Sequence, residues 1–217
     1  MARKRKIPQF PDSYIGNEAF EYDNSKWMER NQKNTTLKII QYLFDEELGP
    51  IDVNPENDLP VLILDLGCGT GFSSEVLKEH GFRVVGIDIL GDMLSKANDK
   101  KKAAKFENIE FILADINNLP IKVNSIDHVV SISAYNFISH GKSSLRERKK
   151  IVNNTAKYLH EILKRNGRVI IEFYPESDEE LKLFTESFTM NGFHGFMIKS
   201  NPTQKSGQTF LLLKRKG

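Results

Sequence analysis

Residues 61–71 place an apolar run, an acidic residue and three alternating glycines in direct succession. The run at 61–66 predicts a buried strand, and Gly67, Gly69 and Gly71 follow it before a helical segment at 72–80. Glycines at alternate positions let the backbone turn sharply and approach a ligand closely. A glycine turn between a strand and a helix N-terminus is where open α/β sheets bind nucleotides. The segment therefore predicts an α/β fold with a nucleotide site at this strand end.

Strands and helices alternate after this loop, which predicts a mostly parallel sheet covered on both faces. The last two strands have no helix between them and must pair antiparallel. We expect an α/β, seven-stranded, doubly wound (Rossmann-like) sheet with an antiparallel edge hairpin. The expected strands are 61–66, 83–88, 109–114, 126–133, 168–174, 194–199 and 209–214, and the expected helices are 72–80, 92–102, 143–164 and 179–190.

The segments before the sheet differ in composition from the rest. Residues 1–17 contain Pro8, Pro11 and Gly16 and predict an extended N-terminal arm. Residues 18–58 predict two helices, with a break near residues 31–34, followed by a loop. Asn166 and Gly167 predict the stop of the long helix 143–164. The domain proper is expected to span residues 18–217.

The charge of the chain is nearly balanced, with 31 basic and 29 acidic residues among 217. The basic residues are nevertheless clustered, at 3–6, 100–102, 146–150 and 214–216, which favours a polyanionic partner, although solvated helix faces explain any single cluster. The single cysteine, Cys68, excludes a disulfide framework and favours an intracellular protein. No apolar stretch is long enough for a membrane span. We expect a cytoplasmic protein, and a nuclear one as well if the source is eukaryotic.

The spacing G-x-G-x-G, in place of the dehydrogenase G-x-G-x-x-G, resembles the loop of S-adenosylmethionine (SAM) methyltransferases of class I. Asp65 ends the first strand, where its carboxylate is expected to meet the amino group of the cofactor, directly or through water; capping of local amides is the alternative. Cys68 is expected to fill space in the loop, because no activating base marks its thiol. The loop glycines are expected to hold the amino-acid part and the ribose.

Further polar residues follow the next strands. Asp88, about twenty residues after the glycine loop, is expected to accept the ribose hydroxyls, with helix capping as the alternative. Asp115 ends the third strand and is expected to accept the adenine amine. The residues expected to flank the adenine or to lie beside the loop are Ile89, Met93, Ile116 and Ser131. Met93 as an ordinary core residue is the alternative to its place beside the adenine.

The segments 131–138, 172–177, 191–195 and 201–202, together with Tyr22-Asp23 and Arg30-Asn31, resemble the small-subunit ribosomal RNA guanine-N(7) methyltransferases of eukaryotes. The resemblance extends from about Phe20 to Leu213. It implies SAM as cofactor, ribosomal RNA as acceptor, a role in ribosome biogenesis, and a small zinc-ribbon activator as partner. The family usually has Gln-Trp where this chain has Asn136-Phe137.

The resemblance places the acceptor at the ends of the fourth and fifth strands. The candidate catalytic residues there are Tyr135, Asn136, Phe137, Phe173 and Tyr174, with core packing as the alternative for each aromatic ring. Guanine N7 carries a free lone pair, so no general base is needed, and the five histidines are expected to be surface or packing residues. We expect no metal site.

The third strand, from Ile109 to Ala114, is expected at the sheet edge. It is nearly all apolar, with Glu110 as its one charged residue, and it has no proline, whereas charges and proline usually protect an edge. Addition of a strand by the activator would cover it, with shielding by a local helix as the alternative. Two other functions stay open for the chain: a methyltransferase of small, quinone-like molecules, with a closed apolar pocket under a lid and no basic rim, and a ribosome-assembly scaffold.

Overall fold

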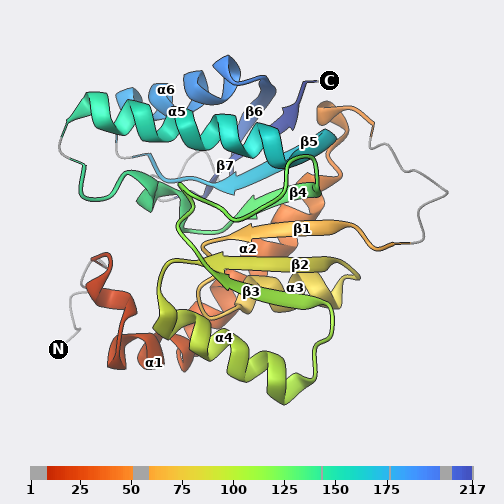
Figure 1. Cartoon of the computed structure of the whole chain (residues 1–217), viewed down its shortest axis with the longest axis vertical. Helices are drawn as coiled ribbons and strands as arrows, with labels where there is room; N and C mark the ends of the chain where they lie inside the picture. Colours follow the sequence, from red (N-terminus) through yellow and green to blue (C-terminus); the bar gives the residue numbers. More distant parts are fainter. Residues whose placement is uncertain (1–8, 51–58, 143, 176, 201–206, 217) are drawn as a thin grey trace.

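The computed structural model describes residues 9–50, 59–142, 144–175, 177–200 and 207–216 (Figure 1). Seven strands form one sheet in the order β3-β2-β1-β4-β5-β7-β6. Strands β1 to β5 run parallel, and β7 pairs antiparallel with both β5 and β6. The predicted doubly wound sheet with an antiparallel edge hairpin is confirmed. The strands are β1 (Leu62–Leu66), β2 (Arg83–Asp88), β3 (Ile109–Leu113), β4 (Ile126–Ser131), β5 (Leu163–Glu172), β6 (Phe193–Lys199) and β7 (Thr209–Arg215).

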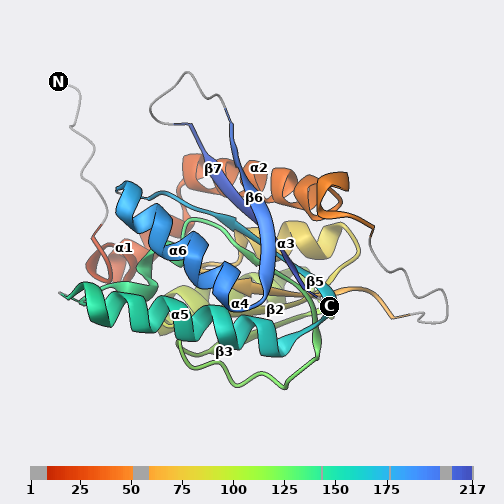
Figure 2. The ribbon, with the colours of Figure 1, turned by 90° about the horizontal axis from the view of Figure 1, so that it is seen from above.

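Helices cover both faces of this sheet. Figure 2 shows α2 and α3 on one side and α5 and α6 on the other. One apolar core includes Ile39 of α2 and Leu77 of α3, and the second includes Val152 of α5 and Phe184 of α6. The helices are α1 (Asn17–Asp23), α2 (Lys26–Leu43), α3 (Phe72–Glu79), α4 (Gly91–Ala104), α5 (Leu145–Ile162) and α6 (Asp178–Met190). Three short 3-10 helices are η1 (Asp12–Tyr14), η2 (Glu46–Leu48) and η3 (Tyr135–Ser139). Within the described part of the chain, no helix combines the length and the apolar character of a membrane span.

Two local predictions are wrong. The N-terminal helices separate at residues 24–25, not near 31–34, because the Ser25 hydroxyl accepts the Met28 N–H and starts α2 there. The long helix ends at Ile162, and β5 begins at the next residue. Asn166 lies inside β5 with φ of 61°, where the pairing with β4 shifts register. Asn and Gly at positions 166 and 167 thus form a bulge in a strand and do not cap a helix.

The N-terminal arm is folded rather than extended over its described residues. It contains η1, and its Gly16 N–H donates to Asp92 Oδ2 at 2.6 Å, which ties the arm to the start of α4. The arm and α1 therefore lie beyond the carboxyl ends of the parallel strands, at the left in Figure 1. The predicted arm at residues 1–8 and most of the loop before β1 lie outside the described residues.

A buried arginine fixes the far end of α2 to the sheet. Arg168 of β5 is about 1% exposed and donates to the carbonyls of Leu43, Asp45 and Gly49. Burial lowers the pKa of its guanidinium. The last carbonyls of a helix have no partner within the helix, so this arginine satisfies groups that water would otherwise need to reach. Because α2 is anchored at this end, its opposite end is held over the strand ends.

Candidate active site

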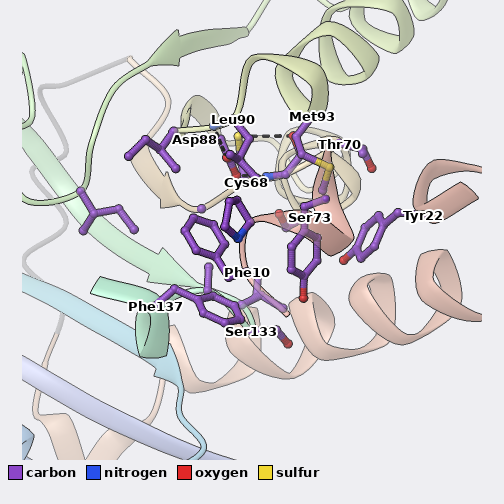
Figure 3. A pocket seen from close by; sticks show the side chains of 18 of the residues that line it. Phe10, Tyr22, Cys68, Thr70, Ser73, Asp88, Leu90, Met93, Ser133 and Phe137 are labelled. Atoms are coloured by element: carbon purple, nitrogen blue, oxygen red, sulfur yellow. Dashed lines mark hydrogen bonds between the residues drawn. The ribbon is translucent and has the colours of Figure 1, made fainter. Parts of the chain in front are cut away.

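The described residues enclose a cavity of about 460 Å³ at the carboxyl ends of β1, β2 and β4. The glycine loop, the end of β2, the link after β3, the segment after β4, helices α1 and α2, and the arm all contribute walls. In Figure 3, Asp88 and Leu90 lie at one end of the cavity and Ser133 and Phe137 at the other. The cavity size is in the range of pockets for cofactors and small ligands.

The glycine loop forms the floor of this cavity. Gly67, Gly69 and Gly71 all have positive φ, at 70°, 55° and 86°. The N–H groups of Gly67 and Cys68 both donate to Ile87 O, which folds the loop back onto β2. Gly67, Cys68 and Gly69 line the cavity. Gly71 does not, and its place is structural: it is the N-cap residue of α3 and lies close to Ala97 and Phe111.

Asp88 lies where a ribose acceptor is expected. Its Oδ2 accepts the Gly69 N–H and its Oδ1 accepts the Leu90 N–H, both at 2.9 Å. It lines the cavity, and burial raises the pKa of its carboxyl. A carboxylate has about four lone-pair sites, so each oxygen keeps capacity for one ligand hydroxyl. The same contacts make Asp88 the group that joins the loop to β2.

Asp65 and Ser131 do not line the cavity, so their expected contacts with the ligand are not supported. Asp65 Oδ2 accepts the hydroxyls of Ser73 and Ser74, at 2.6 and 2.7 Å, and its buried Oδ1 has no hydrogen-bond partner among the described residues. Burial raises the pKa of the Asp65 carboxyl to about 6. Ser131 donates to Leu66 O at 2.9 Å and joins β4 to β1. Asp65 therefore joins β1 to the start of α3, and Ser131 joins β4 to β1, and both contacts stabilise the elements that carry the glycine loop.

The remaining predicted cofactor residues do line the cavity. They are Cys68, Ile89, Met93, Asp115 and Ile116. The side chain of Asp115 is exposed, and its Oδ1 accepts the Asn117 N–H at 2.8 Å. Burial raises the pKa of the Cys68 thiol well above its ordinary value, because a thiolate is disfavoured among apolar groups. The cysteine is buried in the loop, and its space-filling role stays a prediction.

Of the five predicted acceptor residues, the structure places one in the cavity lining and four outside it. Phe137 lines the cavity. Tyr135 and Phe173 are wholly buried and pack on Phe184 of α6, with ring centroids 5.6 and 4.6 Å from its ring. The expectation that these two rings face the acceptor is not supported, because both are buried against the rings of α6.

Asn136 and Tyr174 hold two strand ends together. Asn136 Nδ2 donates to Tyr174 O at 2.7 Å, and Asn136 Oδ1 accepts the Tyr174 N–H at 3.2 Å. The Tyr174 hydroxyl donates to Glu172. Neither residue lines the cavity. Their side chains therefore fix the positions of the chain segments after β4 and β5 and do not themselves contact the cavity.

Sequence reasoning missed the aromatic cover of the cavity. Phe10 stacks on Phe137 with centroids 5.1 Å apart, and Tyr14 meets Phe137 edge-on at 6.1 Å. Tyr22 and Trp27 complete this cover from α1 and α2. The signal for it was present as an unusual density of aromatic residues before the first strand.

One surface histidine lies beside the cavity. His140 is exposed and lines the mouth of the cavity, with its ring 5.1 Å from that of Phe10. His128, by contrast, is buried in the sheet, and burial lowers its pKa to about 4. In the described residues, no group of three or more His, Cys, Asp or Glu side chains could hold a metal ion.

A sheet of this strand order, with a glycine loop after β1 and an acid at the end of β2, defines a protein of the doubly wound methyltransferase class. The chain belongs to the family whose model is described as a methyltransferase domain, which matches residues 60–212. The resemblance to methyltransferases read from the glycine loop is confirmed.

Individual known proteins are similar over most of the chain. An 18S rRNA (guanine-N(7))-methyltransferase of Bos taurus is 30% identical over 92% of this chain, which spans 66% of the bovine protein's length. Magnesium protoporphyrin IX methyltransferase of Synechocystis, solved with bound SAM, shares the fold with a TM-score of 0.65 and 18% identity, covering 94% of each chain. A Haloferax volcanii methyltransferase in complex with the Trm112 methyltransferase activator has a TM-score of 0.57 and 18% identity, covering 90% of this chain and 96% of its own.

Proposed function

We propose that this protein transfers the methyl group of SAM to N7 of a guanine in small-subunit ribosomal RNA, in ribosome biogenesis. The observation that carries the proposal is the cavity between Asp88 and Phe137, built on the glycine loop of a methyltransferase domain. The bovine relative's name supplies the acceptor, and the named segments of the sequence agree with it. The proposed location is the cytoplasm, and the nucleus as well in a eukaryote.

The residues present fit SAM. Asp88 offers two acceptor oxygens for vicinal hydroxyls, and Ile89, Met93 and Ile116 offer apolar surface for a flat base at the same end. Gly67 and Gly69 bring bare backbone to the cavity floor. The bound sulfonium supplies an already activated methyl group.

The chemistry requires little more than positioning. A bond forms between guanine N7 and the methyl carbon while the carbon–sulfur bond breaks, the sulfur keeps that electron pair, and the positive charge passes to the guanine ring. No proton moves, so the reaction needs no base. Alignment of the two reactants alone is worth several orders of magnitude in rate. The protein's task is to hold the base in line at the Phe137 end.

The arm covers that end and must move to admit a nucleobase. The Phe10 ring lies against Phe137 and His140, on the surface where a flat base would stack. Proteins that act on bases in RNA take them out of the stack and hold them on aromatic rings. We propose that Phe137 forms one wall of the base slot and that Phe10 closes it.

A basic surface at the start of α5 supports an RNA acceptor. We call Lys142, Arg146, Arg148, Lys149 and Lys150 the α5 cluster; Lys142 lines the cavity, and only Glu147 opposes its charge. Glu147 is itself held in a capping box by Ser144. Among the residues that the structure describes, none of the five forms an ion pair with an acidic side chain. Figure 1 shows that α5 begins on the same side of the molecule as the arm, and Lys142 is the member of the cluster that lines the cavity.

Neutralising this cluster is expected to weaken RNA binding. The variant Arg146→Gln/Lys149→Gln/Lys150→Gln removes three exposed charges without lowering helix propensity much. Each lost phosphate contact lowers the slope of log affinity against log salt by about 0.7 to 0.9, so three lower it by about 2 to 3. Fluorescence anisotropy with an rRNA fragment at several salt concentrations measures this slope.

The matched control is Lys105→Gln/Lys122→Gln/Lys157→Gln. It makes the same change in net charge, away from the cavity lining. We expect its slope to stay near that of the unmodified protein. Equal losses in both variants would show a non-specific charge effect and remove the support that the α5 cluster gives to an RNA acceptor.

A small-molecule acceptor is the second candidate function, because the aromatic cover matches the lid expected for it. The basic rim of the α5 cluster, which that alternative lacks, favours RNA. Incubation with methyl-labelled SAM and the source's small-subunit rRNA, followed by nucleoside analysis, tests the acceptor. Label in 7-methylguanosine supports the proposal, and label only in small molecules from a cell extract refutes it.

A zinc-ribbon activator is the proposed partner, docked on the edge strand from Ile109 to Ala114. Strand β3 is at the sheet edge, as expected, and Leu113 is 62% exposed. Phe111 faces inward, next to the backbone of Gly86. The similar fold of the Haloferax protein, solved with an activator, supports such a partner.

Leu113→Glu is expected to abolish co-purification of the activator while leaving the unfolding temperature unchanged. A charge on the exposed side of an edge strand blocks strand addition without disturbing the core. Leu145→Glu, another exposed leucine (62%) on α5, is the control. Retained co-purification of the activator with Leu113→Glu overturns the edge assignment.

A further inference from the structure

Glu172 is a buried carboxylate that the proposed reaction has not yet used. It ends β5, is 0% exposed, and lies one hydrogen bond behind the cavity wall. Its Oε2 accepts the hydroxyl of Ser133 at 2.6 Å, and Ser133 lines the cavity beside Phe137 (Figure 3). The carboxylate thus lies behind the acceptor end, at the opposite end from Asp88.

Glu172 accepts hydrogen bonds from three side chains. Its Oε1 accepts the Tyr174 hydroxyl and, at 2.7 Å, Gln208 Nε2. A carboxylate has only acceptor sites, and three side-chain donors directed at its two oxygens occupy them. Burial raises the pKa of the Tyr174 phenol, and the adjacent Glu172 charge raises it further.

This charge has no ion-pair partner among the residues that the structure describes. The cation joined to its network is Lys38, which donates to Gln208 Oε1 at 2.6 Å and so acts one residue away. A buried carboxylate without a direct counter-ion lowers the stability of a fold. Three hydrogen-bond donors nevertheless hold the carboxylate in place, which indicates that it has a functional role.

The field of Glu172 reaches the cavity from two sides. Ser133 is one, and Tyr22 is the other: burial raises the pKa of the Tyr22 phenol, and the charges of Tyr14, Asp88 and Glu172 add to that effect. Tyr22 lines the cavity.

We propose that Glu172 is a positioning residue that acts through Ser133 to favour a cationic ligand at the acceptor end of the cavity. The proposal rests on the proposed function, in which positive charge is present there throughout, first on the sulfonium and then on the methylated guanine. A fixed negative charge in a water-poor site stabilises that charge without reorganisation during the reaction. Glu172 thereby discriminates SAM from its neutral thioether product, S-adenosylhomocysteine.

Calorimetry with these two ligands tests the proposal, because they differ at the sulfur by one methyl group and one charge. In Glu172→Gln we expect the dissociation constant for SAM to rise about tenfold or more, and that for S-adenosylhomocysteine to change less than about threefold. Glu172→Asp, which keeps the charge, is expected to restore most of the preference for SAM. Equal weakening of both ligands, or no change in either, overturns the proposal. Failure of the unmodified protein to bind either ligand instead refutes the proposed function.

Tyr174→Phe keeps the test decisive if Glu172→Gln does not fold. It removes one donor to Glu172 and leaves the carboxylate in place. We expect the preference for SAM over S-adenosylhomocysteine to be retained or increased, because the charge is less compensated. Loss of that preference in Tyr174→Phe shows that packing, and not charge, accounts for the discrimination, and overturns the proposal.

Discussion

Replacement of Asp88 by Ala is expected to weaken SAM binding at least about 100-fold. The carboxylate is placed to accept two ligand hydroxyls, and a hydrogen bond to a charged group contributes about 1.5–3 kcal/mol. Two of them correspond to at least two orders of magnitude in the dissociation constant. The variant also frees the N–H groups of Gly69 and Leu90, which loosens the loop. Isothermal titration calorimetry measures the change.

The control for this prediction is Asp99→Ala, an exposed acid on α4 without a role in the cavity. Its affinity for SAM is expected to equal that of the unmodified protein. The unfolding temperature of Asp88→Ala, measured without ligand, separates loss of the ligand contacts from loss of the fold. An affinity within about threefold of the unmodified protein in a folded Asp88→Ala variant contradicts the ribose assignment.

The cofactor end of the site could be predicted because its signals are local. A strand, a glycine turn and an acid at the next strand end fix the relative positions of Gly67, Gly69 and Asp88 through backbone geometry alone. Asp65 belongs to the same motif, yet its side chain turns away from the cavity and meets Ser73 and Ser74. Which face a strand-end side chain takes depends on the helix that follows, and the motif does not specify it.

The acceptor end could not be predicted because distant segments build it. Phe137 is covered by Phe10, which is 127 positions earlier in the chain. Tyr135, two positions before Phe137, packs on α6, and no periodicity before η3 distinguishes the two rings. The proposed role of Glu172 depends on its hydrogen bonds with Ser133 and Gln208, which are distant in the sequence and become neighbours only in the folded sheet. The aromatic composition of these segments indicates a site for a flat ligand. Which ring lines the cavity and which packs in the core can be decided only from the fold.

Gly67→Ala is expected to lower the free energy of unfolding by about 3 kcal/mol. A Cβ at Gly67 would lie 2.2 Å from Ala134 Cβ, and φ is 70°. Overpacking of this kind costs about 1–3 kcal/mol, and the left-handed backbone adds about 1–2 kcal/mol. For a chain of this size the unfolding temperature would fall by about 6–12 °C. Thermal unfolding followed by circular dichroism checks this.

Two further variants separate the two causes. Gly81→Ala has the same backbone strain, with φ of 87°, but nothing within 4 Å of its new Cβ, so it measures the strain alone. Gly67→Ala/Ala134→Gly removes the atom that clashes, and the next nearest atom, Ala134 Cα, lies 3.6 Å away. We expect the double variant to recover about 1–3 kcal/mol and to resemble Gly81→Ala in its loss of stability. If it recovers nothing, the loop does not approach the segment after β4 as closely as the structure shows. The bare backbone of Gly67 then serves the turn alone, and the glycine loop and the Phe137 end of the cavity are not joined at Ala134.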